Sequence, residues 1–439
     1  MKALLQNIVP PWPGDAAAAL RANLALSLPE PLSRVPPWAA LAAIAVVAYL
    51  ALVRTLRFRA LRALERKHAD LLAPGADPYA MGYRRAAEIS RLALLGDTPF
   101  LFYFGTQWAL VKSYAMATGT PLLAATRQLA DGRRVGRRAE DTALLLVELL
   151  AGDLDAPRGR AALARLNWLH ARYAARIRPA DYVHTLALFV LEPARWVARY
   201  DWRPLSPLER VAYFVYWREI ARRMGFADLV PPTLDALDAW RQAYEAEHMY
   251  FVPSNRTVAD ATVGLFLRSW PAPLRGFARS VFLAFLDEKP VREALGYDDP
   301  PAWATALTSG ILRLRGFVLR HLFLPRWAPM DPLARAGPDG RLYQNVWYVG
   351  FEPWYVADTW WNRAVLWVTT GGRVRLGGAF PGRPGGGYLP EELGPVEFEK
   401  LGQDEVREQA EAMKRFGAPQ QRKDGAYPEA VGCPLAFGF

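Results

Sequence analysis

The sequence predicts an all-α protein that carries an N-terminal transmembrane helix and an aromatic, Gly/Pro-rich C-terminal segment. Three observations lead to this prediction: an uncharged run near the N-terminus, helical spacing of apolar residues through most of the chain, and a change of composition from about residue 337. Alternating strand patterns are scarce. The expected order is a short segment (1–35), a membrane helix (36–56), a helical domain (57–336) and a C-terminal segment (337–439).

The membrane helix is predicted from "PPWAALAAIAVVAYLALV", which is uncharged from Pro36 to Val53 and is close to the minimum length for crossing a hydrocarbon layer of about 30 Å. It is followed by "RTLRFRALRALERK", in which six basic residues face one acid, Glu65, whereas residues 1–35 are nearly balanced in charge. The positive-inside tendency therefore predicts a lumenal N-terminus and a cytosolic body. A short buried core helix is the alternative, because alanine makes the run only moderately apolar.

Composition and motifs exclude several classes of protein. The single cysteine, Cys433, excludes a disulfide framework, a cysteine-rich zinc site and covalent haem attachment. The net charge of +11 fits a nucleic-acid binder or an anionic membrane surface, but no nucleic-acid module is present, so we expect no nucleic-acid partner. The chain has no phosphate loop, H-E-x-x-H or G-x-S-x-G motif, and its five histidines are isolated, unlike the paired histidines of membrane di-iron desaturases.

The helical domain is predicted from segments with apolar residues three and four positions apart and with Ser, Asp or Pro near their starts. The clearest segments are "RRAEDTALLLVELLAG", "RGRAALARLNWLHARYAARI", "DYVHTLALFVLEPARWVARY" and "LSPLERVAYFVYWREIARRMG". Gly152 and Gly225 follow two of them, where a C-terminal cap is expected.

His170 lies within the second of these segments and projects from an apolar stripe. Leu163 and Leu166 precede it by seven and four positions, and Tyr173 and Ala174 follow it by three and four. A haem bound through one neutral imidazole needs only such a histidine, apolar walls and a polar group or two on the opposite side. A packed core histidine is the alternative.

A second polar feature heads the preceding helix. Arg138 and Thr142 are four residues apart and share a face that Leu145 and Leu149 continue. One cation and one hydroxyl thus precede an otherwise apolar stripe. The alternative is a solvated arginine in the first turn of a helix.

The C-terminal segment begins with "YQNVWYVGFEPWYVADTWWNRAVLWVTTGG", which is dense in Trp and Tyr, and continues with a Gly/Pro loop and a polar tail. Clustered aromatic residues suit either an edge lying against lipid headgroups or a packing face against the helical body. The loop "FPGRPGGGY" contains no cysteine, so thiolate ligation of a haem is not expected there.

The R-x-x-x-T pattern followed about thirty residues later by "LNWLH" resembles the MpaB-type ER-bound oxygenase family, which is related to latex-clearing rubber oxygenases. Further matches follow in order and cover most of residues 80–400, among them "EHMYFVPSNRTVADATVGLF", "LRHLFLPR", "EPWYV" and "ELGPVEF".

The resemblance implies a globin-like helical body that holds a non-covalent haem b. His170 matches the axial iron ligand of the family, and Arg138 and Thr142 match polar residues on the oxygen-binding side. His184 stands where some relatives have histidine and others tyrosine; it is the second choice for the ligand and otherwise a pocket-wall residue. Asp141 stands where rubber oxygenases have lysine, which puts their substrate and proton handling in doubt for this chain.

The function implied is a haem-dependent, membrane-bound oxygenase of the endoplasmic reticulum that uses dioxygen to cleave a C=C bond of an isoprenoid or other lipophilic substrate. In this scheme Arg138 stabilises negative charge on the reacting oxygen, Thr142 hydrogen-bonds the oxygen or a water, and the lipid bilayer delivers the substrate. The alternatives are a haem peroxidase or monooxygenase acting on a small lipid, and a non-catalytic membrane-anchored helical protein. A glycan at the sequon Asn255–Thr257 would place the body in the lumen.

Overall fold

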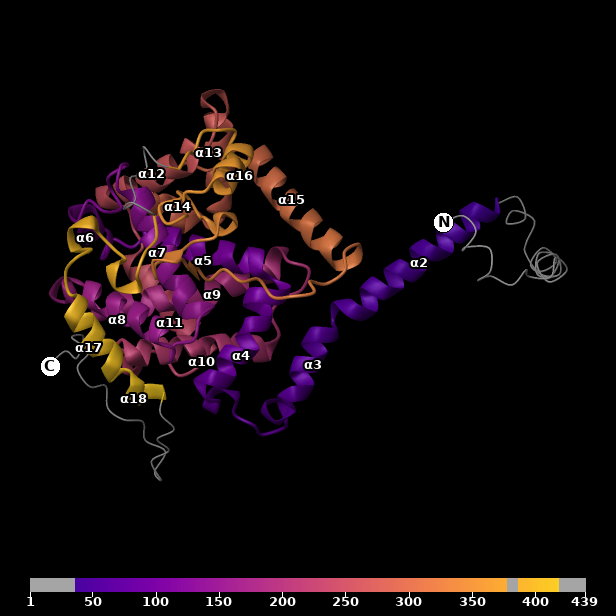
Figure 1. Ribbon diagram of the computed structural model, residues 1–439, viewed down its shortest axis with the longest axis horizontal. Coiled ribbons are helices and arrows are strands. Elements are labelled where there is room, and N and C mark those ends of the chain that lie inside the picture. Colours follow the sequence, from indigo (N-terminus) through magenta and orange to yellow (C-terminus); the bar gives the residue numbers. More distant parts are fainter. Residues whose placement is uncertain (1–35, 377–385, 418–439) are drawn as a thin grey trace.

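The computed structural model describes residues 36–376 and 386–417. It shows a helical body from which one long helix projects (Figure 1). The predicted lumenal segment 1–35 and Cys433 lie outside the described residues. The prediction of a mostly helical protein with one long apolar helix near the N-terminus is confirmed.

The elements follow one another in a simple order along the chain. The α-helices are α2 (Pro37–Arg57), α3 (Arg59–Lys67), α4 (Tyr83–Arg91), α5 (Pro99–Ser113), α6 (Thr120–Ala125), α7 (Val135–Leu150), α8 (Pro157–Ala171), α9 (Pro179–Tyr200), α10 (Pro207–Arg223), α11 (Leu234–His248), α12 (Pro253–Arg268), α13 (Arg275–Phe285), α14 (Lys289–Leu295), α15 (Ala302–His321), α16 (Trp360–Thr370), α17 (Gln403–Ala412) and α18 (Lys414–Gly417). The shorter helical turns are η1 (Ala69–Leu72), η2 (Pro78–Ala80), η3 (Leu92–Asp97), η4 (Ala174–Arg176), η5 (Ala227–Leu229), η6 (Ala272–Leu274), η7 (Val346–Tyr348), η8 (Pro390–Glu392) and η9 (Val396–Phe398). The described strands, β1 (Arg335–Ala336) and β2 (Leu342–Tyr343), form an antiparallel pair.

Local sequence signals set the helix starts. Proline occupies one of the first positions of α5, α8, α9, α10 and α12, where its missing N–H costs no intrahelical hydrogen bond. Ser206 and Glu209 also form a reciprocal capping box at the start of α10. At the other end of α10, Gly225 has a φ of 83° and caps the helix as predicted. Gly152 has no such conformation; a Cβ there would lie 2.3 Å from the backbone oxygen of Glu148.

The end of α8 differs from the prediction. The sequence places His170 in the middle of a helix that runs to residue 177, but α8 ends at Ala171. The N–H of Tyr173 bonds the carbonyl of His170 at 2.9 Å, a tighter spacing than that of an α-helix, and the turn η4 follows. The expectation that Tyr173 and Ala174 continue the stripe of His170 is therefore wrong, and His170 lies in the last turn of its helix.

The centre of the body is built on α5 and α9, which lie side by side in Figure 1. A Cβ on Gly105 of α5 would come within 2.6 Å of the Cα of Pro193 in α9, so only glycine permits this close approach. Around this contact the rings of Phe104 and Trp196 meet edge to face, with centroids 5.0 Å apart. Residues of both helices belong to the large hydrophobic core of the body.

The C-terminal segment packs across α7 and α8 through buried polar contacts. The Arg165 guanidinium of α8 donates to the carbonyls of Leu393, Phe398 and Leu401, each at 2.8 Å. The Tyr388 hydroxyl donates to Glu148 of α7 at 2.7 Å. These contacts come from residues that follow the aromatic stretch, and they fix the later part of the segment to the helical body. The segment's exposed tryptophans point outwards; they are Trp347, Trp360, Trp361 and Trp367.

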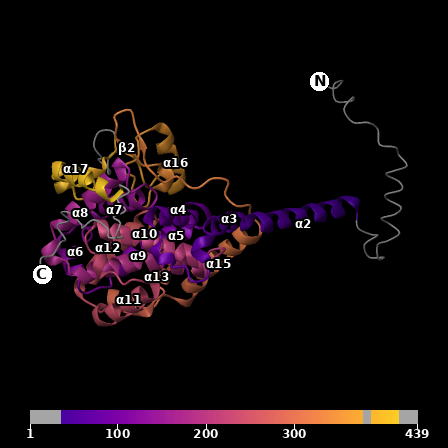
Figure 2. The ribbon, with the colours of Figure 1, turned by 90° about the horizontal axis from the view of Figure 1, so that it is seen from below.

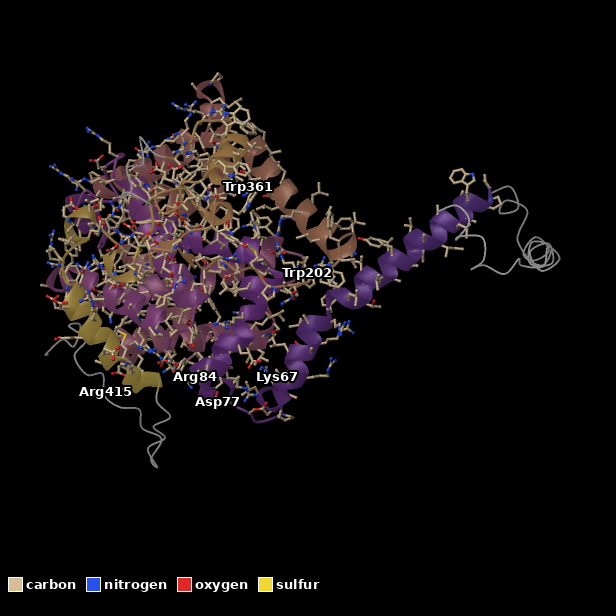
Figure 3. The ribbon with its side chains drawn as sticks, viewed as in Figure 1. Lys67, Asp77, Arg84, Trp202, Trp361 and Arg415 are labelled. Atoms are coloured by element: carbon tan, nitrogen blue, oxygen red, sulfur yellow. The ribbon has the colours of Figure 1, made fainter. Side chains whose placement is uncertain are left out.

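Helix α2 projects from the body, as two views show (Figures 1 and 2). Of its residues only Val53 and Arg57 are buried, so the alternative of a buried core helix is wrong. By length and composition it could cross a membrane. Its base is fixed to the body near Trp202, labelled in Figure 3. The Arg57 guanidinium lies 4.9 Å from the Trp202 ring centroid, and the Phe58 ring meets that ring edge-on at 5.3 Å.

Candidate active site

Helices α7 and α8 pack together and bring His170 close to Arg138. Burial, together with the positive charge of Arg138, lowers the pKa of His170 to about 4, so the imidazole is neutral at physiological pH. Its Nδ1 atom is buried and has no hydrogen-bond partner. A buried, neutral and incompletely bonded imidazole has the properties that a metal ligand requires.

Thr142 holds Arg138 in a fixed arrangement. The Arg138 guanidinium donates to the Thr142 hydroxyl oxygen, and the hydroxyl donates to the backbone carbonyl of Arg138 at 2.9 Å. The hydroxyl proton is thus already used inside the helix. Thr142 therefore orients the guanidinium in this structure, while Leu145 and Leu149, further along the same face, are buried as predicted.

Three tyrosines that the sequence analysis did not single out lie near α7 and α8. Tyr182 of α9 meets the His170 ring edge-on, with centroids 5.5 Å apart. Burial raises the pKa of Tyr114, which follows α5, and the charge of Arg138 partly offsets that rise. Burial also raises the pKa of Tyr103, yet this residue is 39% exposed. The charge of Glu140 adds to that rise, so Tyr103 lies near this carboxylate of α7.

His184 lies in a different environment. Its ring is buried, and Nε2 lies 3.1 Å from a carboxylate oxygen of Glu245. Glu245 also pairs with Arg241 and lies 3.5 Å from the ammonium group of Lys112. The structure thus places His184 at the edge of a buried group of charged residues, whereas the charge of Arg138 acts on His170.

The sequon at Asn255 cannot carry a glycan in the folded protein. The Asn255 side chain is fully buried, and its amide donates to the carbonyls of Ala115, Tyr250 and Ala294 at 2.9 to 3.2 Å. The amide nitrogen that a glycan would occupy is therefore used to join α12 to its neighbours. Asn255 is a structural residue here.

Two buried carboxylates on α7 face the C-terminal segment. Glu140 accepts hydrogen bonds from the backbone N–H groups of Phe351 and Glu352, and Asp141 accepts one from the Tyr355 hydroxyl. Burial raises the pKa of Glu140 to about 7 and that of Asp141 to about 6. Asp141 thus contacts the C-terminal segment.

These carboxylates predict a pH dependence of stability. Because their folded pKa values are raised, the folded state binds protons more tightly than the unfolded state, whose carboxyls titrate near pH 4. The free energy of unfolding should fall as pH rises from about 4 to about 7, by on the order of a few kcal/mol from these two groups. Chemical denaturation at several pH values measures the slope.

The matched variants are Asp141→Asn and Asp298→Asn. Asparagine at 141 retains an acceptor for Tyr355 but cannot ionise, so it should flatten the slope, whereas the exposed Asp298 should leave it unchanged. A stability that rises with pH across this window, or a slope that is the same in both variants, would contradict the interpretation.

The donor set determines which cofactor could be held. The described residues contain no group of three or more His, Cys, Asp or Glu side chains placed to hold a metal ion. A metal at His170 would therefore need a prosthetic group that brings its own ligands, as a porphyrin does. The neutral imidazole, the nearby cation and the buried leucines fit such a group.

Comparison with known proteins decides the family. Residues 92–320, just over half of the chain, match the catalytic domain of the family described as ER-bound oxygenase mpaB/B'/Rubber oxygenase. The chain belongs to this family. Membership implies an oxidoreductase of the oxygenase type, and the matched region contains Arg138, Thr142, His170 and His184.

Relatives within the family come from Penicillium. The chain is 28% identical over 427 residues to the ER-bound oxygenase mpaB' of Penicillium brevicompactum, covering 89% of this chain and 98% of the relative. It is 27% identical to the ER-bound oxygenase mpaB of the same species, covering 82% and 86%. For the mpaB of Penicillium roqueforti the identity is 29%, covering 60% and 92%. The first alignment spans nearly the whole relative, so the likeness extends beyond the catalytic domain.

Proposed function

We propose that this oxygenase holds haem b through His170 and uses dioxygen to cleave a C=C bond of an isoprenoid or other lipophilic substrate. The observation that carries the proposal is the buried, neutral imidazole of His170, with an unpartnered nitrogen, under the charge of Arg138. Family membership supports the oxygenase class. The haem cofactor and the substrate class are what we propose beyond the oxygenase class.

Each residue has a distinct task in this proposal. When bound, haem would supply the redox-active iron that activates dioxygen. His170 is the ligand, because burial keeps its imidazole neutral. Arg138 is a permanent cation that stabilises negative charge developing on the reacting oxygen atoms, and such a charge acts strongly where water is excluded. Thr142 is a positioning residue that fixes the guanidinium.

The substrate class follows from the surroundings of the site. Its walls are aromatic and aliphatic, and the projecting α2 suits insertion in a membrane, where hydrophobic alkenes partition. The relatives are described as ER-bound, which supports the same location for this chain. We propose that α2 crosses the ER membrane once, with residues 1–35 in the lumen and the body in the cytosol.

An absorption spectrum of the purified full-length protein tests the proposal. We expect a Soret band that shifts on reduction, and a pyridine haemochrome spectrum of haem b. Incubation with a polyisoprenoid under ¹⁸O₂ should give two carbonyl products, each carrying label. Protein without a Soret band would overturn the proposal. An uncleaved product that carries a single labelled oxygen, or turnover that requires peroxide, would replace the cleavage reaction with monooxygenase or peroxidase chemistry.

A further inference from the structure

Helix α15 presents an apolar stripe to the outside of the body. Its residues recur three or four positions apart and are each 38% to 63% exposed: Trp303, Leu307, Ile311, Leu314 and Phe317. The opposite face of the same helix is buried against the body through Ala304, Thr308, Leu312 and Gly316. The stripe therefore stays exposed although α15 is packed on the body. A contiguous exposed apolar surface of this kind marks a binding site.

The chain at the end of α15 is hydrogen-bonded to α2 near the end of the uncharged run of that helix. The Tyr49 hydroxyl donates to the carbonyl of Leu322 at 3.0 Å, and the Arg57 guanidinium donates to the carbonyls of Phe323 and Leu324. Between them lies Val53, which is fully buried and is the last residue of the uncharged run. The chain that leaves α15 thus meets α2 where that helix would leave the hydrocarbon layer.

The direction of α15 places its stripe along a membrane surface. Figure 1 shows α15 running across the direction of α2, with α16 near its start; in Figure 2 α15 and α16 lie apart, on either side of the line along which α2 projects. Trp361 of α16, labelled in Figure 3, is 54% exposed, and Trp360 and Trp367 of that helix are more exposed still. If α2 crosses a bilayer, these side chains are at its surface.

We infer that the α15–α16 face, made of the α15 stripe and the exposed tryptophans of α16, rests in the interfacial layer of the bilayer that α2 crosses. The inference depends on the proposed function only in taking α2 as a membrane span. Tryptophan rings are favoured at this depth. Arg313 and Arg320 are exposed on the same helix, and Arg326 follows it, so cations are available for lipid phosphates.

The face also lies next to the exposed end of α5. The Arg315 guanidinium of α15 is 4.5 Å from the ring centroid of Phe100, and Tyr103 lies one turn further along α5. Phe100 and Tyr103 are both exposed. Docking of the face would therefore bring the exposed end of α5 into contact with lipid. A lipophilic substrate could then pass from the bilayer to the protein without crossing water.

Site-specific fluorescence in vesicles tests the inference. In a full-length Cys433→Ser background, Leu314→Cys, Leu401→Cys and Ile44→Cys are each labelled with NBD and reconstituted into phosphatidylcholine–phosphatidylserine vesicles, with and without doxyl-labelled lipid. Leu401 is exposed and stands two residues before α17, a helix that lies on the side of the body away from α2 in both views. Ile44 lies within the uncharged part of α2.

We expect blue-shifted emission and quenching by the doxyl lipid at positions 44 and 314, and emission typical of water without quenching at 401. Quenching at 44 with water-like emission at 314 would overturn the docking surface and leave the anchor in place. A blue shift at 314 that depends on protein concentration, without lipid quenching, would assign the face to a second copy of the chain instead. No quenching at 44 would overturn both anchor and face.

The Soret band of the same samples separates this inference from the haem proposal. A sample with haem and a water-exposed label at 314 contradicts only the docking surface. A sample without haem whose label is quenched by lipid contradicts only the haem site and supports the docking surface.

Discussion

The variant His170→Ala is expected to fold and to lose its haem. Removing the imidazole leaves the iron without its protein ligand, and the loss of affinity should exceed the roughly 100-fold upper range seen when an outer-shell partner of a metal ligand is removed. Soret absorbance per protein, followed during titration with haem, measures the effect. Added imidazole should restore part of the band, because it can fill the space of the missing side chain.

Two other histidines serve as comparisons. His248→Ala should keep full haem, since its ring packs against Tyr244 with centroids 4.5 Å apart and lies on the end of α11. His184→Ala removes the partner of Glu245 and should lower thermal stability while haem is retained. Full haem in His170→Ala would exclude His170 as the ligand, and loss of haem in His184→Ala alone would assign the ligand to His184.

Arg138→Met is expected to retain haem but to lower turnover by about 10²- to 10³-fold, the usual effect of removing one group that stabilises a developing negative charge. The methionine fills similar space without a charge, so the change isolates the electrostatic contribution. Turnover per haem with the cleaved substrate is the measurement. Arg133→Met, which removes an exposed cation just before α7, should leave turnover unchanged.

Thr142 provides a graded test of the same arrangement. Thr142→Val removes the acceptor of the Arg138 guanidinium and should lower turnover by about tenfold, whereas Thr142→Ser keeps the hydroxyl and should restore most of it. Equal turnover in the valine and serine variants would show that the hydroxyl does not position the guanidinium. Unchanged turnover in Arg138→Met would exclude the arginine from the reaction.

Local periodicity was sufficient to predict the helices that carry the site. The segments that became α7, α8, α9 and α10 have apolar residues three and four positions apart, and α8, α9 and α10 also begin with a proline. Both signals act within a few residues. The shared face of Arg138 and Thr142 follows from the same spacing. These features depend only on neighbours along the chain, so the sequence could show them.

Long-range polar contacts could not be predicted in this way. Glu140 meets Phe351, and Arg165 meets Leu393, across more than two hundred residues of chain. Nothing near Glu140 in the sequence distinguishes a buried carboxylate from one on a solvated helix face. The same limit applies to His184, because a buried histidine beside a carboxylate and one that holds iron occupy the same kind of apolar helix.

The contacts of the C-terminal segment also determine how large the working enzyme must be. The family's catalytic domain ends at residue 320, yet the carbonyls that satisfy Arg165, and the backbone donors that satisfy Glu140, all come from later residues. A chain that ended at residue 320 would leave Arg165 of α8 and Glu140 of α7 without these hydrogen-bond partners. The part of the chain that matches the family's catalytic domain is therefore smaller than the unit that must be kept intact for the active centre to hold its shape.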